Sequence, residues 1–374
     1  MDLDFSAEQE TIRGMVRGVL AEHCPIGVVR RLEDDRIGYP TDLWKQLGEL
    51  GVIGMLLPEA YGGSGQSLVD AAIVYEELGR ALAPTPHFAS AVMAGGVLLA
   101  AGSDAQKREW LPAIASGERI VVPAWVEPDR SETARGVQLR AERDSGGYRL
   151  HGVKRHVPFA AAASQLLVLA RTGERDTDVD VFLVDPGAPG VALTQQLAMA
   201  SDAQFRLALE GVRVPEANRI GAPGSGWAHW EAALLDGIVL LAAQAVGGAE
   251  RALEITVEYA KERVQFGKPL GAFQAIAHYL ADASTRVDGA RTLVYEAAWT
   301  RSMSRPIDKL APMAKLFACQ TFRDTTAMCE QVWGGVGFTI EYDIQLYFRR
   351  AKQLQLSWWD TRALEERVAA AVLD

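Results

Sequence analysis

The chain has 374 residues, of which 49% are hydrophobic and 23% are charged, and its formal net charge is −10. This length is sufficient for a large hydrophobic core and for more than one domain. The acidic balance comes without a block of basic residues, so nucleic acid is not expected as a main partner.

The N-terminus and the cysteines indicate the compartment. The first residues, MDLDFSAEQE, are acidic and lack the apolar core of a signal peptide. The three cysteines, Cys24, Cys319 and Cys329, are scattered and odd in number, which argues against a disulfide framework. Without neighbouring histidines they do not form a metal-binding pattern. We expect a cytoplasmic protein with no metal centre, whose cysteines are small buried side chains.

Residues 1–118 have helical periodicity throughout. Ser6 and Gln9 have the spacing of a capping box, and apolar residues recur at helical intervals after them. The glycine-rich loop Pro58–Gly65 is interpreted as a turn between helices, since it lacks the lysine of a P-loop. These residues are predicted to form an N-terminal α-helical domain. Its later helices are expected at residues 68–83, 90–101 and 104–116.

From residue 119 the pattern changes to short, partly alternating apolar segments separated by turn residues such as Ser145-Gly146-Gly147. Helices do not alternate with these segments, so a doubly wound dinucleotide-binding fold is not supported. Residues 119–220 are therefore predicted to form an antiparallel β domain. Its strands are expected at residues 120–123, 137–141, 148–152, 165–170, 179–185 and 205–210.

Residues 221–374 are helical again and are predicted to form a four-helix-type bundle. Long patterns cover residues 227–263, 272–302 and 309–332, and shorter helices are expected at 344–356 and from 361. The run Ala232–Ala249 approaches membrane-spanning length, but Asp236 and Gln244 interrupt it. We interpret it as a helix buried in the bundle, with no membrane span.

The segment Tyr259–Asp282 joins two of these helices at a corner. Gly267 is predicted to stop the first helix in a left-handed conformation, and Pro269 prevents the helix from resuming. Arg263 can bind phosphate through two parallel hydrogen bonds, and Phe266 can stack on a flat base. The alternative is a solvated helix end with basic residues near its negative dipole.

Five motifs resemble the acyl-CoA dehydrogenase family. The corner reads ER-x-x-FG-x-PL-x-x-FQ, followed by LAD, and is similar to the family signature. The segments LPEAYGGSG, EELGRALAPTP and DAQKREWLPAIASGE resemble the N-terminal domain of the family, and QVWGGVGFTIEY resembles its C-terminal cofactor segment. The resemblance covers nearly the full length and implies an α+β fold with helical, β and helical domains in that order.

The resemblance also implies an activity. The family oxidises an acyl-CoA thioester with FAD: a carboxylate removes the α-proton, and the β-hydride passes to the flavin. Matching positions imply a set of residues for the adenine and pyrophosphate end of FAD, which in this family is bound by the neighbouring subunit. That set is Arg263, Phe266, Gln274, Gln331, Gly334 and Gly335.

The residues that would border the flavin ring match less well. The family usually has Thr-Glu-Pro-Gly-x-Gly-Ser after the first strand, whereas this chain has Val126–Glu132 with a different sequence, VEPDRSE. The Trp-Ile-Thr/Ser segment of the family aligns with His156–Pro158. Hydroxyl groups that would bond to the ring are missing or displaced, and His156 is interpreted as structural or exposed.

The usual catalytic glutamate is not found at its expected position. Counting from the segment Arg349–Lys352, that position falls on Trp358, whose indole cannot accept a proton. Some members carry the glutamate on the helix after the β domain, which here corresponds to Gly237. Asp236 and Glu231 remain as candidates on that helix. Asp236 lies within an apolar run, where an acidic group is costly and often marks function, and the alternative is that it is a buried partner for an arginine elsewhere.

Four functions follow from this pattern. The first is a dehydrogenase subunit that works in a dimer or dimer of dimers with a paralogous subunit, which supplies the base, while an electron-transfer acceptor reoxidises the flavin. The second is a self-sufficient homo-oligomer that uses Asp236 or Glu231. The third is a non-catalytic scaffold or acyl-CoA-binding subunit, and the fourth is the same fold redirected to flavin-dependent oxidation or oxygenation.

Overall fold

The computed structural model describes residues 4–128 and 132–373. The chain divides into two compact units. The helical unit comprises Met1–Arg30, Ser67–Ala83 and Ile238–Asp374, and the sheet unit comprises Arg31–Gln66 and Pro84–Gly237. Along the chain, helices come first, a β-sheet follows in the middle, and helices return, which confirms the predicted fold class.

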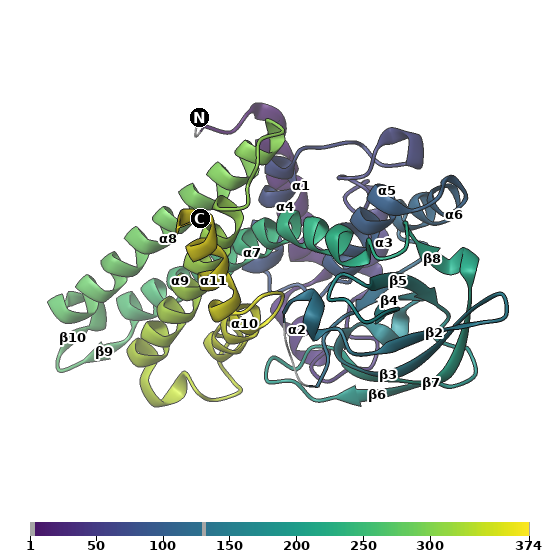
Figure 1. Cartoon of the computed structure of the whole chain (residues 1–374). Coiled ribbons are helices and arrows are strands. Elements are labelled where there is room, and N and C mark those ends of the chain that lie inside the picture. The colour runs from purple at the N-terminus through teal and green to yellow at the C-terminus, as the bar shows by residue number, and fades with distance from the viewer. Residues whose placement is uncertain (1–3, 129–131, 374) are drawn as a thin grey trace. The chain divides into compact units, whose positions relative to one another are not determined.

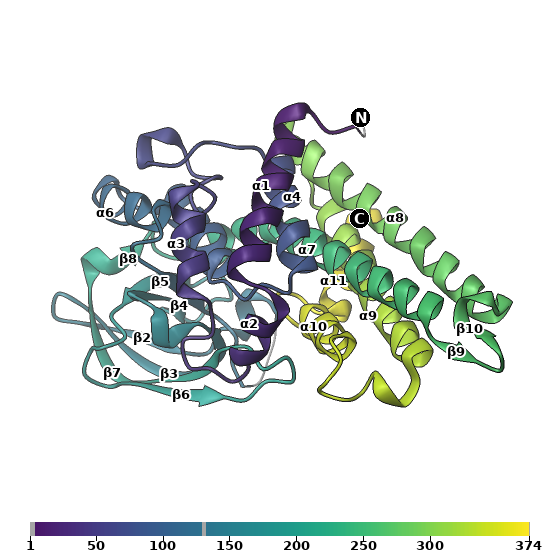
Figure 2. The same ribbon diagram turned by 180° about the vertical axis from the view of Figure 1, so that it is seen from behind.

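The helical unit is a bundle in which α8 and α9 lie side by side (Figures 1 and 2). Its first helix begins as predicted, because the Ser6 hydroxyl accepts a hydrogen bond from the Gln9 N–H and the Gln9 side chain accepts one from the Ser6 N–H. The helices are α1 (Ala7–His23), α2 (Ile26–Arg31) as far as Arg30, α4 (Leu68–Arg80), the part of α7 (Gly226–Glu262) from Ile238 onward, α8 (Gln274–Ser302), α9 (Leu310–Trp333), α10 (Ile344–Leu356) and α11 (Thr361–Leu373).

The helices α4 and α7 touch backbone to backbone. A Cβ atom on Gly79 would overlap the Gln244 carbonyl oxygen, and one on Gly247 would overlap the Glu76 carbonyl oxygen. Both positions therefore require glycine. At the same crossing, the Arg291 guanidinium donates to the Glu76 carboxylate at 2.8 Å and ties α8 to α4.

In the described residues, the sheet unit contains one eight-stranded sheet in the order β6-β7-β3-β2-β4-β5-β8, with β1 paired to β4. The main ladders are antiparallel, as predicted, whereas β1 runs parallel to β4. A parallel pair needs a crossover connection, which the β2–β3 hairpin provides here. The strands are β1 (Val121–Ala124), β2 (Arg140–Asp144), β3 (Gly147–Pro158), β4 (Gln165–Arg171), β5 (Val179–Val184), β6 (Val191–Gln196), β7 (Gln204–Pro215) and β8 (Arg219–Ile220).

Helical segments accompany this sheet in the same unit. They are α3 (Thr41–Glu49), α5 (Gly95–Ala101) and α6 (Asp104–Ala115), with a short 3₁₀ turn at Glu59–Tyr61. The segment predicted as one helix over residues 90–101 is instead a wide π-helical stretch, Phe88–Ala94, that leads into α5. The β6 and β8 strands were not predicted, because β6 is a half-exposed edge strand rich in Gln and Thr and β8 has two residues.

One helix in the described part of the chain, α7, is long and apolar enough to cross a membrane. However, 72% of its most apolar window is buried inside the structure. This burial is typical of the core helix of a globular protein, which is how the run Ala232–Ala249 was interpreted from the sequence.

The three cysteines are free, buried thiols, as expected. Cys24 lies at the end of α1, and Cys319 and Cys329 lie on the buried face of α9. Burial raises the pKa of the Cys24 and Cys329 thiols to about 12 and also raises the pKa of Cys319. They therefore behave as small hydrophobic side chains.

Candidate functional site

The corner after α7 is a short hairpin in the helical unit. The helix ends at Glu262, and the two-residue strands β9 (Val264–Gln265) and β10 (Lys268–Pro269) pair around Phe266 and Gly267. Both turn residues have positive φ, 53° and 80°, which is the backbone of a type I′ hairpin. The prediction that Gly267 stops the helix is therefore wrong: Gly267 closes a hairpin five residues beyond the helix end.

The hairpin carries an exposed ring and an exposed guanidinium. Phe266 is 91% exposed, and Arg263 and Gln274 are also exposed. The Phe273 ring meets Phe266 edge-on with centroids 6.2 Å apart, and the Lys268 ammonium lies 4.2 Å from the Phe273 centroid. A large, solvent-exposed ring such as Phe266, close to a cationic side chain, is typical of a surface that binds a ligand or another subunit.

The second predicted segment lies at the end of α9. Gly334 ends this helix with φ 66°, and a Cβ on Gly334 or Gly335 would have no neighbouring atom within 4 Å. Gln331, one turn earlier, is exposed. The backbone here is therefore open to a ligand, and a pyrophosphate could approach it without a side chain in the way.

Aromatic contacts bring the two segments together. The Trp333 ring stacks on Tyr259 with centroids 3.9 Å apart, and the Trp333 indole N–H donates to the Thr256 hydroxyl at 3.0 Å. Tyr259 precedes Arg263 by one helical turn, and the Arg263 N–H donates to the Tyr259 carbonyl. Arg263 and the glycine segment after Trp333 are thus anchored at the same end of α7. These residues fit a ligand with a flat base and phosphates.

Beneath the glycine segment lies a buried carboxyl group that the sequence reasoning missed. Glu330 on α9 is 2% exposed, and neither carboxyl oxygen has a hydrogen-bond partner in the described part of the chain. Burial raises the pKa of Glu330 to about 7. A Cβ on Gly337 would overlap one of its oxygens, so the turn Gly334–Gly337 rests directly on the carboxyl.

The position expected for a catalytic base lies between α10 and α11. Trp358 and Trp359 have φ of 56° and 68°, so two consecutive bulky residues adopt the left-handed region. The buried Lys315 ammonium on α9 stabilises this turn by donating to the carbonyl oxygens of Leu354, Ser357 and Trp359 at 2.8–3.2 Å. Trp358 is half-buried, and its indole offers no proton acceptor.

The two alternative acids lie in the sheet unit, whereas Trp358 and the predicted FAD residues lie in the helical unit. Glu231 and Asp236 are both half-buried on the first turns of α7. At the neighbouring Gly237, a Cβ would come within 3.1 Å of the Phe88 ring and 3.2 Å of the Met93 sulfur. A side chain at Gly237 would therefore require these two residues to shift.

A buried ion pair organises the segment that aligns with the flavin-bordering region of the family. The Lys154 ammonium on β3 is 2.5 Å from the Glu127 carboxylate, which also accepts hydrogen bonds from the N–H groups of Gln138 and Leu139. Burial lowers the pKa of Lys154, and Glu127 opposes that shift. The differences from the family sequence that were noted at Asp129–Ser131 lie outside the described residues.

His156 lies next on β3, at a bulge where the pairing with β7 shifts register. It has φ 53° and is exposed. Its N–H donates to the Gln196 side chain at 3.0 Å, and its Nδ1 lies 2.8 Å from the Gln204 side-chain oxygen. These contacts with β6 and β7 give His156 a structural role in the sheet unit.

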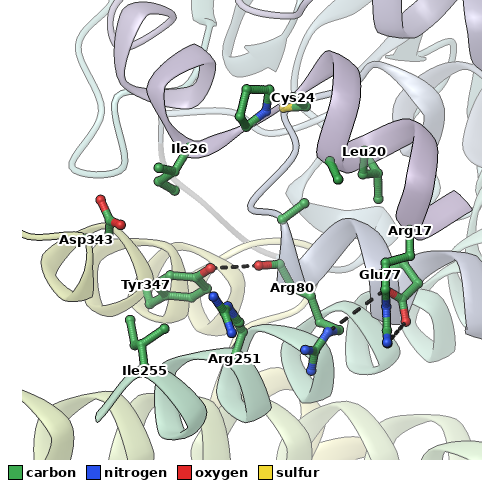
Figure 3. A pocket seen from close by; sticks show the side chains of 13 residues that line it. Arg17, Leu20, Cys24, Ile26, Glu77, Arg80, Arg251, Ile255, Asp343 and Tyr347 are labelled. Carbon is green, nitrogen blue, oxygen red and sulfur yellow. Dashed lines mark hydrogen bonds and ion pairs between the residues drawn. The ribbon is translucent and has the colours of Figure 1, made fainter. Parts of the chain in front are cut away.

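The helical unit also contains a pocket of about 390 Å³, lined by α1, α4, α7 and α10 (Figure 3). Its lining is mixed, with apolar side chains beside the guanidinium groups of Arg17, Arg80 and Arg251. Arg17 pairs with Glu77, and Arg80 and Arg251 both pair with Glu254. These guanidinium groups are therefore already engaged in ion pairs, and none of the predicted site residues lines the pocket. No cluster of possible metal ligands occurs among the described residues.

Comparisons with known proteins agree with this architecture. Family models for the acyl-CoA dehydrogenase N-terminal, middle and C-terminal domains match residues 6–118, 123–212 and 224–357. A probable acyl-CoA dehydrogenase, YngJ, from Bacillus subtilis is 33% identical over 364 residues, which is 95% of each chain.

Two solved structures are similar over the whole chain. The butyryl-CoA dehydrogenase from Megasphaera elsdenii has a TM-score of 0.93 at 29% identity, covering 100% of both chains. A chain of the ChsE4–ChsE5 complex from Mycobacterium tuberculosis has a TM-score of 0.90 at 29% identity, covering 100% of this chain and 99% of that one. The three matched domains, the full-length relative and the shared fold lead to one conclusion: the chain belongs to the acyl-CoA dehydrogenase family.

Proposed function

We propose that this chain is an FAD-dependent acyl-CoA dehydrogenase subunit that works with a paralogous subunit, which supplies the catalytic glutamate. The observation that carries the proposal is Trp358, an indole in the segment where the family places its base. The chain would catalyse α,β-dehydrogenation of an acyl-CoA thioester only within that complex, and an electron-transfer acceptor would reoxidise it.

The adenine and pyrophosphate end of FAD would be held by the hairpin and the glycine segment. Arg263 would grip phosphate, Phe266 would stack on the adenine, and Gly334 and Gly335 would let the backbone approach the pyrophosphate. Gln274 and Gln331 would add amide hydrogen bonds. When bound, FAD would supply the hydride acceptor that the protein side chains lack.

The heteromeric assembly has support among the structural neighbours. One of them, at 29% identity, is a chain of the complex of two different proteins, ChsE4 and ChsE5. A second feature is the exposed apolar surface of the helical unit, where Phe338 and Ile340 are 67% and 77% exposed. Surface of this kind is typical of subunit interfaces.

The self-sufficient homo-oligomer remains the second candidate, favoured by the half-buried carboxylates of Asp236 and Glu231 on α7.

Purifying the chain alone and with a paralogous subunit tests both functions. We expect the chain alone to be colourless and the co-expressed complex to be a yellow dimer or dimer of dimers by light scattering. A yellow homo-oligomer with full FAD occupancy and turnover would support the second candidate. A colourless protein with every partner would support a scaffold.

Replacing Arg263 with alanine is expected to weaken FAD retention in the complex by about 1.5–3 kcal/mol, or roughly 10- to 150-fold, because a charge-assisted phosphate contact is lost. Flavin release measured by fluorescence gives the change. Arg362→Ala is the matched control, since Arg362 is 87% exposed on α11 and pairs only with Glu366 among the described residues. Equal flavin affinity in both variants would exclude Arg263 from the clamp.

A further inference from the structure

The buried Glu330 is the strongest unexplained chemical feature of the helical unit. A carboxyl group with no hydrogen-bond partner is rare in a protein interior, because its desolvation is not compensated. Most buried acids avoid this cost through a cation or through backbone N–H groups, as Glu127 does with Lys154. In the described part of the chain, Glu330 has neither.

The position of Glu330 connects it to the proposed cofactor clamp. It lies one helical turn before Gly334, and its carbonyl oxygen accepts the Gly334 N–H at the end of α9. Its carboxyl group occupies the space that a side chain on Gly337 would need. The turn Gly334–Gly337 is closed by a hydrogen bond from the Gly337 N–H to the Gly334 carbonyl, so it folds back over the carboxyl.

Among the described residues, no charged group contributes to the raised pKa of Glu330, which burial alone causes. Cys329 is the neighbouring buried thiol on α9, and its pKa is raised to about 12 by burial. On α7, Tyr259 stacks on Trp333, and Tyr342, from the loop before α10, meets the same ring edge-on. A thiol or a phenol cannot carry a positive charge, so none of these three groups can compensate a carboxylate. An ionised Glu330 would therefore be an isolated negative charge under the turn.

We propose that Glu330 is a positioning residue of the cofactor clamp: as a neutral acid it supports the Gly334–Gly337 turn, and its ionisation loosens that turn and weakens the binding of a pyrophosphate ligand. This inference rests on the proposed function, since it assumes that the turn binds FAD. Two effects act in the same direction. The buried charge favours opening of the turn to water, and it repels the negative pyrophosphate.

The direction of the pH dependence follows from the linkage between proton binding and folding. The pKa of Glu330 in the folded chain is raised above that of an ordinary glutamate, so the folded turn prefers the protonated form. Below the pKa of an ordinary glutamate, Glu330 makes its full contribution to the stability of the folded chain. This contribution is lost as the pH rises through the raised pKa that Glu330 has in the folded chain. Binding of a pyrophosphate should take up a proton, and affinity should fall by up to about tenfold per pH unit, the limit for one linked proton.

The test uses ADP, which carries the adenine and pyrophosphate without the flavin ring, and the assembled complex. Titration calorimetry between pH 6 and pH 8.5 gives the affinity of the wild type, Glu330→Gln and Glu330→Asp. We expect a falling affinity above pH 7 in the wild type and in Glu330→Asp, which keeps an ionisable group. Glu330→Gln should lack this fall, and the pH dependence that it keeps should be that of the terminal phosphate of ADP, which ionises in this range with every variant. Glu296→Gln, at an exposed position on α8, is the control and should behave as the wild type.

Infrared difference spectra provide a readout that does not depend on the ligand. The carboxyl carbonyl band of the wild type should disappear between pH 6 and pH 8, and this change should be missing in Glu330→Gln. The same variant should unfold at a higher temperature than the wild type at pH 8 and at an equal temperature at pH 4. If the ADP affinity has the same pH dependence in wild type and Glu330→Gln, the inference is wrong and the clamp stands. If ADP binds at no pH, both the clamp and the inference are wrong.

Discussion

Turnover of an acyl-CoA by the isolated chain, with FAD and an artificial electron acceptor added, is expected to be about 10²–10⁴-fold below that of its complex with a base-bearing paralog. The reason is Trp358, whose indole N–H is a donor only and cannot take the α-proton. Asp236→Asn in the complex should leave turnover almost unchanged, because the partner carries the base.

A gain-of-function variant sharpens this test. Trp358→Glu places a carboxylate in the turn that Lys315 holds through three carbonyl oxygens, and it should raise the turnover of the isolated chain. Trp358→Gln is the matched control of equal size without a base, and it should stay inactive. Robust turnover by the unmodified chain would contradict the two-subunit function. If that activity then vanished in Asp236→Asn with the fold intact, Asp236 would be the base.

The second large effect concerns the buried pair of Glu127 and Lys154. Breaking a buried ion pair by removing one partner costs about 3–5 kcal/mol, since the other charge stays buried without compensation. Glu127→Gln should be the more severe change: Lys154 is 0% exposed, and its ammonium then faces a neutral amide oxygen and the Trp125 carbonyl at 3.5 Å, with no negative charge to compensate it. Lys154→Met should cost less, because Glu127 retains the N–H groups of Gln138 and Leu139.

Chemical denaturation monitored by circular dichroism measures both changes. The double variant Glu127→Gln/Lys154→Met should recover a large part of the lost stability, because it removes both charges together. Arg175→Met serves as the control, since Arg175 is 83% exposed in its pair with Asp178 and exposed pairs contribute little. Equal, small effects for all variants would mean that the pair does not hold the segment in place.

The sequence predicted the elements that bury a regular apolar face. The helices at residues 272–302 and 309–332 match α8 and α9 to within about two residues, because their apolar positions recur at helical spacing. It could not predict the end of α7. Glycine is common both after a helix and in a hairpin, and only the tertiary structure shows that Gly267 pairs with Phe266 in a type I′ turn.

The sequence indicated candidate site residues only at positions where the residue type has a specific chemistry. Arg263 and Gly334 stand out in a sequence, whereas Glu330 appears as an ordinary polar residue of a helix. A signal for it was present: Lys315, Cys319, Phe322, Thr326 and Glu330 follow one another at intervals of three or four, which places both charged residues on the buried face of α9. The sequence does not show that Lys315 donates to three carbonyl oxygens, whereas the Glu330 carboxyl has no hydrogen-bond partner among residues 4–128 and 132–373.

The reactivity of the buried cysteines can be used to measure local opening of the helical unit. Cys24, Cys319 and Cys329 all lie in the helical unit, and the sheet unit contains no cysteine. An exposed thiolate is the nucleophile that attacks a thiol reagent, so buried, un-ionised thiols should react only when the bundle opens. The labelling rate, followed by mass spectrometry, would therefore measure how often the helices that carry the proposed clamp come apart, without a contribution from the β-sheet.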